Sequence, residues 1–175
     1  IRIGKAFGTE CVNQGQDTVV LAGDGRNSTP RLKAAVQEGL MAVGCHVIDI
    51  GSVPTPLMNF AVSTLPDVRS GIMVTASHNP ASDNGFKMVI DGYSLASEQI
   101  RRIKERVQEG DFNEGIGDCR QLDIVDEYIE NIVSDIVLAG NYKVVVDCGN
   151  GIASIVGPRL LEELGCEVVP LYCDV

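Results

Sequence analysis

Short runs of apolar, mostly β-branched residues alternate with segments whose apolar residues recur at helical spacing, and this alternation constrains the fold most. The run TVVLA at 18–22 is typical of a buried strand, whereas Leu32, Val36 and Leu40 share one face of a helix. The expected elements are a strand at 18–22, a helix at 30–43, a strand at 46–50, a helix after Pro56 that ends near Leu65, and a strand at 71–76. This order indicates an α/β domain.

The connection between the apolar runs at 71–76 and 86–90 is short, spanning only residues 77–85. Because a parallel pair needs a crossover of a dozen or more residues, we expect these runs to form an antiparallel hairpin. The charged segment that follows, at 96–109, has the pattern of an amphipathic surface helix. The sequence therefore predicts an α/β fold with a mixed sheet sandwiched by helices.

Residues 110–118 (GDFNEGIGD) are rich in glycine and acidic residues, which suits a domain boundary or an exposed linker. We therefore expect one domain at 1–118 and the start of a second α/β domain of the same type, truncated, at 119–175. Its expected elements are a helix at 124–138, a strand at 143–147, a helix around 158–164 and a strand at 167–172. The segments 30–50 and 158–172 share one pattern: each starts with Pro-Arg-Leu in an expected helix and continues through Gly-Cys into an expected strand. This pattern favours repeated β-α-β modules, with chance similarity as the alternative.

Composition excludes several classes of function. The formal net charge of −10 argues against nucleic acid as a partner, because binding to its backbone depends on clustered Lys and Arg. Six cysteines without a C-x2-C pair and only two histidines indicate reduced thiols and no zinc site. No apolar run reaches about 18 residues, so we expect a cytoplasmic protein without membrane association. The chain starts at Ile1 rather than Met, so we expect a piece of a longer chain. The sequence does not give the oligomeric state.

Loops that leave the carboxyl ends of the predicted strands are the expected ligand site, as in other open α/β sheets. These loops are 23–29, 51–56 and 77–85. In the hairpin, we expect residues 76 and 86 to lie near each other at the mouth of the loop, so that Ser77 and Lys87 can approach each other. A serine oxygen is a weak nucleophile by itself, and Lys87 or Arg26 is a candidate source of activating charge. A polar turn without a catalytic role is the alternative.

Two further loops have more than one interpretation. Residues 24–26 (DGR) can place Arg26 where a guanidinium binds phosphate with two parallel hydrogen bonds, or can form a glycine-rich turn before a helix. Residues 147–151 (DCGNG) allow either a tight turn or a backbone phosphate nest. A hydrolase triad fits poorly, because there is no G-x-S-x-G elbow and His78 is the immediate neighbour of Ser77.

The segment 75–80 (TASHNP), followed by 84–87 (NGFK), resembles the phosphoserine signature of the alpha-D-phosphohexomutases, in the expected strand-loop-strand setting. The resemblance extends over nearly the whole chain. Residues 24–26 fall where the family has its D-x-R loop, and 145–151 (VVDCGNG) are similar to the opening of its second domain. The Gly-Phe-Lys ending is most similar to the bacterial phosphomannomutase/phosphoglucomutase branch of the family.

The resemblance implies an intramolecular phosphotransferase that interconverts hexose 1-phosphate and hexose 6-phosphate, with mannose and glucose as the sugars. It implies that phosphorylated Ser77 donates its phosphoryl group to the sugar and takes one back from a hexose 1,6-bisphosphate intermediate. It also implies Mg²⁺ held by a Ser77 phosphoryl oxygen, proton transfer or charge balance by Lys87, and support of the loop by His78 and Arg26. Hexose phosphates are therefore the expected small-molecule partners.

The resemblance further implies that parts of the family's active site lie outside this sequence. An aromatic-Asp-Ile-Arg-Gly segment would precede Ile1, whereas the D-G-D-G-D-R magnesium loop, the G-E-M-S-G sugar loop and a phosphate-binding loop would follow Val175. We therefore expect this chain alone to lack mutase activity. Two alternatives stay open: a phosphoglucosamine mutase, which differs in the sugar loop, and a non-catalytic sugar-phosphate sensor with the same fold.

Overall fold

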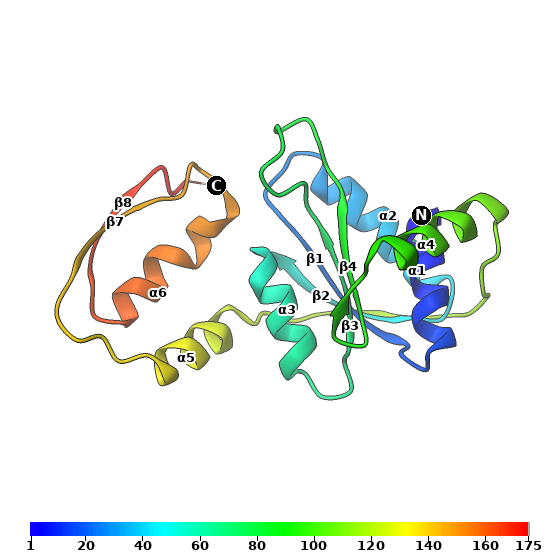
Figure 1. Cartoon of the computed structure of the whole chain (residues 1–175), viewed down its shortest axis with the longest axis horizontal. Helices are drawn as coiled ribbons and strands as arrows, with labels where there is room; N and C mark the ends of the chain where they lie inside the picture. The colour runs from blue at the N-terminus through cyan, green and yellow to red at the C-terminus, as the bar shows by residue number, and fades with distance from the viewer. Residues whose placement is uncertain (175) are drawn as a thin grey trace.

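The computed structural model describes residues 1–174, which contain a six-stranded sheet with helices on both faces and a smaller two-stranded unit (Figure 1). The large sheet has the strand order β5-β4-β3-β1-β2-β6. The elements are α1 (Arg2–Asn13), β1 (Thr18–Gly23), α2 (Thr29–Met41), β2 (His46–Ser52), α3 (Thr55–Thr64), β3 (Ser70–Val74), β4 (Phe86–Ile90), β5 (Tyr93–Ser94), α4 (Ser97–Glu109), β6 (Cys119–Gln121), α5 (Val125–Asp135), β7 (Lys143–Asp147), η1 (Ile152–Ile155), α6 (Gly157–Glu163) and β8 (Glu167–Leu171). The predicted mixed sheet between helices is confirmed.

The central strand β1 pairs in parallel with β2 and β3, and β3 pairs antiparallel with β4. The predicted hairpin is therefore confirmed, but β3 ends at Val74, two residues before the expected end of the strand. Phe86 lies opposite Val74, and the last bond runs from the Thr75 N–H to the Gly85 carbonyl oxygen (2.9 Å). Just past the end of the strand, the Thr75 side chain turns inward to a carboxylate on the neighbouring loop.

Two hydrophobic cores lie on opposite faces of the sheet. Successive side chains of a strand point to opposite faces, so Val20 and Ala22 pack in the core beneath α3, whereas Val19 and Leu21 pack beneath α1, α2 and α4. All four side chains are fully buried. A strand covered on both faces reads as a continuous apolar run, which is why it was visible in the sequence.

Helix α1 was not among the predicted elements, because its glycines lower its intrinsic helix propensity. The glycines serve the packing of α1 against α2. A Cβ atom on Gly4 would clash with the Val36 carbonyl group, and one on Gly39 would clash with the Ile1 carbonyl oxygen. Close contact between the two helices, with Phe7 buried below them, therefore sustains a helix that propensity alone disfavours.

Strand β6 belongs to the first sheet, which differs from the boundary expected between residues 118 and 119. Its residues pair in parallel with β2, with Cys119 opposite Val47. The preceding glycines allow a close approach of two backbones, because a Cβ atom on Gly117 would clash with the Cys45 carbonyl group. Glycine-rich composition therefore accompanies tight packing here, and the first sheet includes residues through Gln121.

The second unit contains the parallel pair β7 and β8 with α6 between them, as predicted for a β-α-β module. Helix α5 connects it to the first unit and packs on α3, where the Phe60 and Tyr128 rings meet edge to face at 5.4 Å. Both Pro-Arg-Leu helices end before a left-handed glycine, Gly44 (φ 93°) and Gly165 (φ 88°). The expected domain at 119–175 ends on Val175, which lies outside the described residues.

No helix within residues 1–174 has the length and apolar character needed to cross a bilayer. The six cysteines are free thiols. Burial raises the pKa of the Cys45 thiol to about 12 and also raises the pKa of the Cys11 thiol strongly. Both thiols are therefore protonated at neutral pH, and their contribution is to packing rather than to reactivity.

Candidate active site

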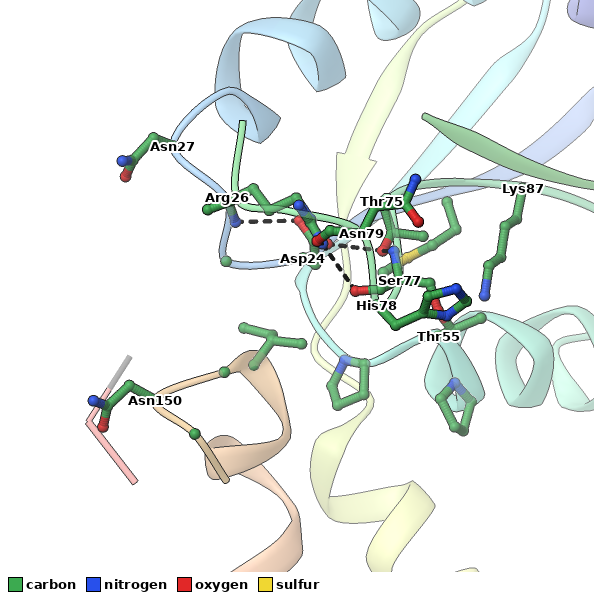
Figure 2. A pocket seen from close by; sticks show the side chains of 18 residues that line it. Asp24, Arg26, Asn27, Thr55, Thr75, Ser77, His78, Asn79, Lys87 and Asn150 are labelled. Atoms are coloured by element: carbon green, nitrogen blue, oxygen red, sulfur yellow. Dashed lines mark hydrogen bonds and ion pairs between the residues drawn. The ribbon is translucent and has the colours of Figure 1, made fainter. Parts of the chain in front are cut away.

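Four loops border a cleft of about 730 Å³ at the carboxyl ends of the strands (Figure 2). Three of them follow β1, β2 and β3, which confirms the expectation that these loops meet at one edge of the sheet. The fourth follows β7 in the second unit and contributes residues 149–151. The four residues chosen from the sequence, Ser77, His78, Lys87 and Arg26, all line this cleft.

Ser77 lies in the loop after β3 and has a left-handed backbone conformation with a φ of 56°. This conformation costs a residue other than glycine about 1–2 kcal/mol, so surrounding contacts must hold it. The Ser77 N–H donates to Oγ1 of Thr75 (2.9 Å), and the Ser77 carbonyl oxygen accepts from Nη2 of Arg26 (2.8 Å). The backbone of Ser77 is therefore fixed on both sides, while the residue stays exposed at the cleft.

Arg26 uses all five N–H groups of its guanidinium, one for Asp24 and four for the loop after β3. Its Nε donates to Oδ2 of Asp24 (3.0 Å), and its terminal nitrogens donate to four backbone carbonyl oxygens of the loop. These carbonyl groups belong to Ser77, Asn79, Pro80 and Asp83. The two-pronged contact with phosphate that the sequence allowed is therefore not available, because no guanidinium N–H is left for it.

The carboxylate of Asp24 accepts hydrogen bonds on both of its oxygens. Oδ1 accepts from the Arg26 backbone N–H (3.1 Å) and the Thr29 hydroxyl (2.8 Å), and Oδ2 accepts from Arg26 Nε and the Thr75 hydroxyl (2.7 Å). Burial by itself would raise the pKa of Asp24, but the hydrogen bonds from Thr75, Thr29 and Arg26 outweigh burial and hold its pKa below the ordinary value. Asp24 is therefore a charged anchor for the loop at neutral pH.

Replacing Asp24 with asparagine should destabilise the protein at neutral pH, and this effect should fade in acid. A carboxyl with a depressed pKa contributes stability above its unfolded pKa of about 3.9, and the contribution is lost as the pH falls through the folded pKa. The difference in urea midpoint between wild type and Asp24→Asn should therefore shrink below about pH 4. As a control, Asp67→Asn removes an exposed carboxylate that accepts no side-chain hydrogen bond within residues 1–174. A difference that stayed constant down to pH 2 would contradict this role of Asp24.

Asn84 ties the far end of the same loop to the segment after β1. Its Nδ2 donates to the hydroxyls of Ser28 (2.9 Å) and Thr29 (3.0 Å), and its Oδ1 accepts from the Gly85 N–H (2.9 Å). Sequence reasoning assigned no role to Asn84 or Thr75, although both lie within the motif. A signal was present for Thr75, because a hydroxyl at the end of a buried strand must find a hydrogen-bond partner.

Lys87 lies on β4 and reaches the cleft beside Ser77 and His78 (Figure 2). Among the residues that the structure describes, no ion pair involves Lys87 or His78. An ammonium group without a carboxylate partner is available to donate hydrogen bonds to a ligand such as a phosphoryl group. The hairpin therefore brings Ser77 and Lys87 to one cleft, as its short connection predicted.

The loop after β7 forms a tight turn rather than a phosphate nest. Gly149 and Asn150 both have left-handed φ angles, of 54° and 53°. Their N–H groups and that of Gly151 already donate to acceptors within the second unit. The acceptors are Oδ1 of Asp147 and the carbonyl oxygens of Tyr172 and Cys148. Because these donors are taken, the turn is the interpretation that the structure supports.

The residues that the structure describes do not build a magnesium site by themselves. Magnesium requires near-octahedral coordination by oxygen ligands, and residues 1–174 contain no group of three acidic, histidine or cysteine side chains that could hold a metal ion. Asp24 is the acidic residue that lines the cleft, and its oxygens already accept four hydrogen bonds. A phosphoryl oxygen on Ser77 is the ligand that this chain could add.

The sequence is similar to known proteins along its whole length. Residues 1–114 match the family described as phosphoglucomutase/phosphomannomutase, alpha/beta/alpha domain I. The chain is 46% identical to a phosphomannomutase/phosphoglucomutase of Pseudomonas aeruginosa strain PAO1, over 99% of this chain and 37% of that protein. It is 41% identical to a probable phosphoglucosamine mutase of Pyrococcus abyssi, over 99% of this chain and 39% of that protein. The chain thus spans well under half the length of these relatives.

The fold is also similar to a solved structure. A phosphoglucomutase/phosphomannomutase family protein from Burkholderia thailandensis superposes with a TM-score of 0.96 at 46% identity, over 99% of this chain and 40% of that one. The match to domain I covers more than half of this chain and includes the hairpin loop that carries Ser77. This chain therefore belongs to the phosphoglucomutase/phosphomannomutase family.

Proposed function

We propose that this chain supplies the phosphoserine part of a phosphohexomutase active site, in an enzyme that interconverts the 1-phosphates and 6-phosphates of mannose and glucose. One observation carries this proposal: the backbone of Ser77 is clamped on both sides, while the residue stays exposed in a cleft that it shares with Lys87. A loop that merely joined two strands would not need these contacts. The names of its relatives support the class of reaction.

In the proposed reaction, the bond between phosphorus and Oγ of phosphorylated Ser77 breaks as a bond forms between phosphorus and a sugar hydroxyl oxygen. The proton of that hydroxyl moves to the Ser77 oxygen, and Lys87 carries the proton or balances the developing charge. The product is a hexose 1,6-bisphosphate. After the sugar reorients, the reverse step returns its other phosphoryl group to Ser77.

The remaining components of the site are proposed to come from outside this chain. Because the described residues build no magnesium site, we limit their contribution to a phosphoryl oxygen on Ser77. The chain spans 37% of its relative from Pseudomonas aeruginosa, and we propose that it lacks mutase activity by itself. The term full-length protein is used below for a protein that contains this chain and has the length of the family's members. A cytoplasmic location, without nucleic-acid or membrane partners, also stays a proposal from composition.

Replacing Lys87 with alanine in the full-length protein should lower kcat about 10²- to 10³-fold. The loss is expected because no other ammonium group lines the described cleft of residues 1–174. A coupled assay that follows glucose 6-phosphate formation measures it. The matched control is Lys104→Ala, on the exposed face of α4, which should leave kcat within about twofold of wild type. A Lys87→Ala variant with wild-type kcat would contradict the proposed role.

Two other candidate functions give different results in one experiment on the full-length protein. Turnover is measured with the 1-phosphates of mannose, glucose and glucosamine. Our proposal predicts turnover of the first two, whereas preference for glucosamine 1-phosphate would favour the phosphoglucosamine mutase that the Pyrococcus relative suggests. Binding of all three without any turnover would favour a sugar-phosphate sensor and would overturn the proposed function.

A further inference from the structure

The hydroxyl of Thr75 lies between the Asp24 carboxylate and the backbone of Ser77, two residues further along the chain. Thr75 is 6% exposed, its hydroxyl donates to Oδ2 of Asp24 (2.7 Å), and it accepts from the Ser77 N–H (2.9 Å). A hydroxyl has a single proton to donate. Because the carboxylate takes that proton, the lone pairs of Thr75 Oγ1 are oriented toward the Ser77 N–H.

The same carboxylate oxygen also fixes the other side of Ser77. Oδ2 of Asp24 accepts from Nε of Arg26, and Nη2 of Arg26 donates to the Ser77 carbonyl oxygen. The two peptide groups that flank Ser77 are thus connected to one buried oxygen, one through a hydroxyl and one through a guanidinium. These two contacts hold the backbone on either side of Ser77, whose φ angle of 56° is left-handed. Contacts on both sides are what such a conformation requires.

We infer that Thr75 is a positioning residue for phosphoryl transfer, whose hydroxyl holds Ser77 in its left-handed conformation and so sets the direction of the Ser77 side chain relative to Lys87. The inference rests on the proposed role of Ser77 as the phosphoryl carrier. Without the hydroxyl, Ser77 relaxes toward the negative φ angles that serine prefers, and its Cα–Cβ bond swings away from the cleft. Small displacements of a reacting group reduce rates strongly.

Two substitutions separate the hydroxyl of Thr75 from its shape. Thr75→Val keeps the branched shape but removes the hydroxyl, and it should lower kcat of the full-length protein about 10- to 100-fold with KM changed less than about threefold. Thr75→Ser keeps the hydroxyl and should restore kcat to within about threefold of wild type. The opposite order, with Val active and Ser impaired, would assign the effect to packing of the methyl group and overturn the inference.

Thr29→Val provides a matched control for loss of a hydrogen bond to Asp24. Thr29 is at least as buried as Thr75, and its hydroxyl donates to Asp24 Oδ1 (2.8 Å). It also accepts from Asn84 (3.0 Å) at the far end of the loop, but no hydrogen bond connects it to Ser77. This variant should also be less stable than wild type, yet its kcat should fall less than about threefold. Equal losses of kcat in Thr29→Val and Thr75→Val would contradict a specific action on Ser77.

Hydrogen exchange at the Ser77 amide tests the inference without relying on catalysis. In the full-length protein, this N–H should exchange at least about tenfold faster in Thr75→Val than in wild type or in Thr75→Ser, because its acceptor is gone. An unchanged exchange rate would overturn the inference even if Ser77 carries phosphate. Absence of phosphate on wild-type Ser77 would instead refute the proposed function, and the exchange result would still decide whether Thr75 holds the Ser77 backbone.

Discussion

Replacing Ser77 with alanine in the full-length protein is expected to abolish mutase turnover, with a loss of kcat of at least about 10⁴-fold. The expected loss is large because the hydroxyl oxygen is the atom that bonds to phosphorus in both half-reactions. Alanine offers no atom that can replace it, and the backbone contacts of residue 77 involve only its N–H and carbonyl group. The fold should therefore persist while the reaction stops.

The matched control for Ser77→Ala is Ser82→Ala in the same loop. Ser82 is exposed, and its hydroxyl makes only a 3.3 Å contact with Asp83. This variant should turn over hexose phosphates within about twofold of wild type. Turnover of Ser77→Ala at the wild-type rate, measured with the same assay, would exclude Ser77 as the phosphoryl carrier.

Arg26→Ala is expected to lower the free energy of unfolding of the full-length protein by about 2–4 kcal/mol. The substitution removes five side-chain hydrogen bonds and leaves the mostly buried Asp24 carboxylate without its cationic partner. Arg26→Lys should recover only part of this loss, because an ammonium group has three donors and lacks the planar fork that reaches four carbonyl oxygens. Urea unfolding measures the stability of both variants.

Arg31→Ala is the control for the loss of an arginine. Arg31 is exposed on α2, a few residues after Arg26 in the sequence. It takes part in no ion pair among the residues described. Its replacement should change the free energy of unfolding by less than about 0.5 kcal/mol. Equal stability of Arg26→Ala and Arg31→Ala would mean that the contacts of Arg26 contribute little to the loop.

The central part of the fold was predictable from local patterns. Residues 18–22 read as a buried strand because both faces are covered, and the short connection between 71–76 and 86–90 required a hairpin. Helix α1 was not predictable in the same way, because Gly4 is explained only by the close approach of another helix. The packing of residues 110–118 was not predictable for the same reason, since Gly117 allows a close approach to the Cys45 backbone.

The residues of the site were also predictable only in part. The hairpin and the strand order brought Ser77, Lys87 and Arg26 to one cleft, and the family resemblance gave them roles. The hydrogen bonds by which Arg26 holds the loop after β3 could not be predicted from the sequence. Four of their acceptors are backbone carbonyl groups, which any residue provides. The link from Asp24 through Thr75 to Ser77 depends on a strand that ends two residues early, and no sequence pattern gives that register.

The most direct test is the covalent state of Ser77 in the full-length protein purified without exposure to substrate. The protein is digested, and the peptide that contains Ser77 is examined by tandem mass spectrometry, before and after brief reaction with glucose 1-phosphate. We expect one phosphoryl group on Ser77 before the reaction, and its appearance on the sugar as hexose bisphosphate when Ser77 loses it. An unmodified Ser77 in a protein that turns over hexose phosphates, or a phosphoryl group on another residue, would contradict the assignment.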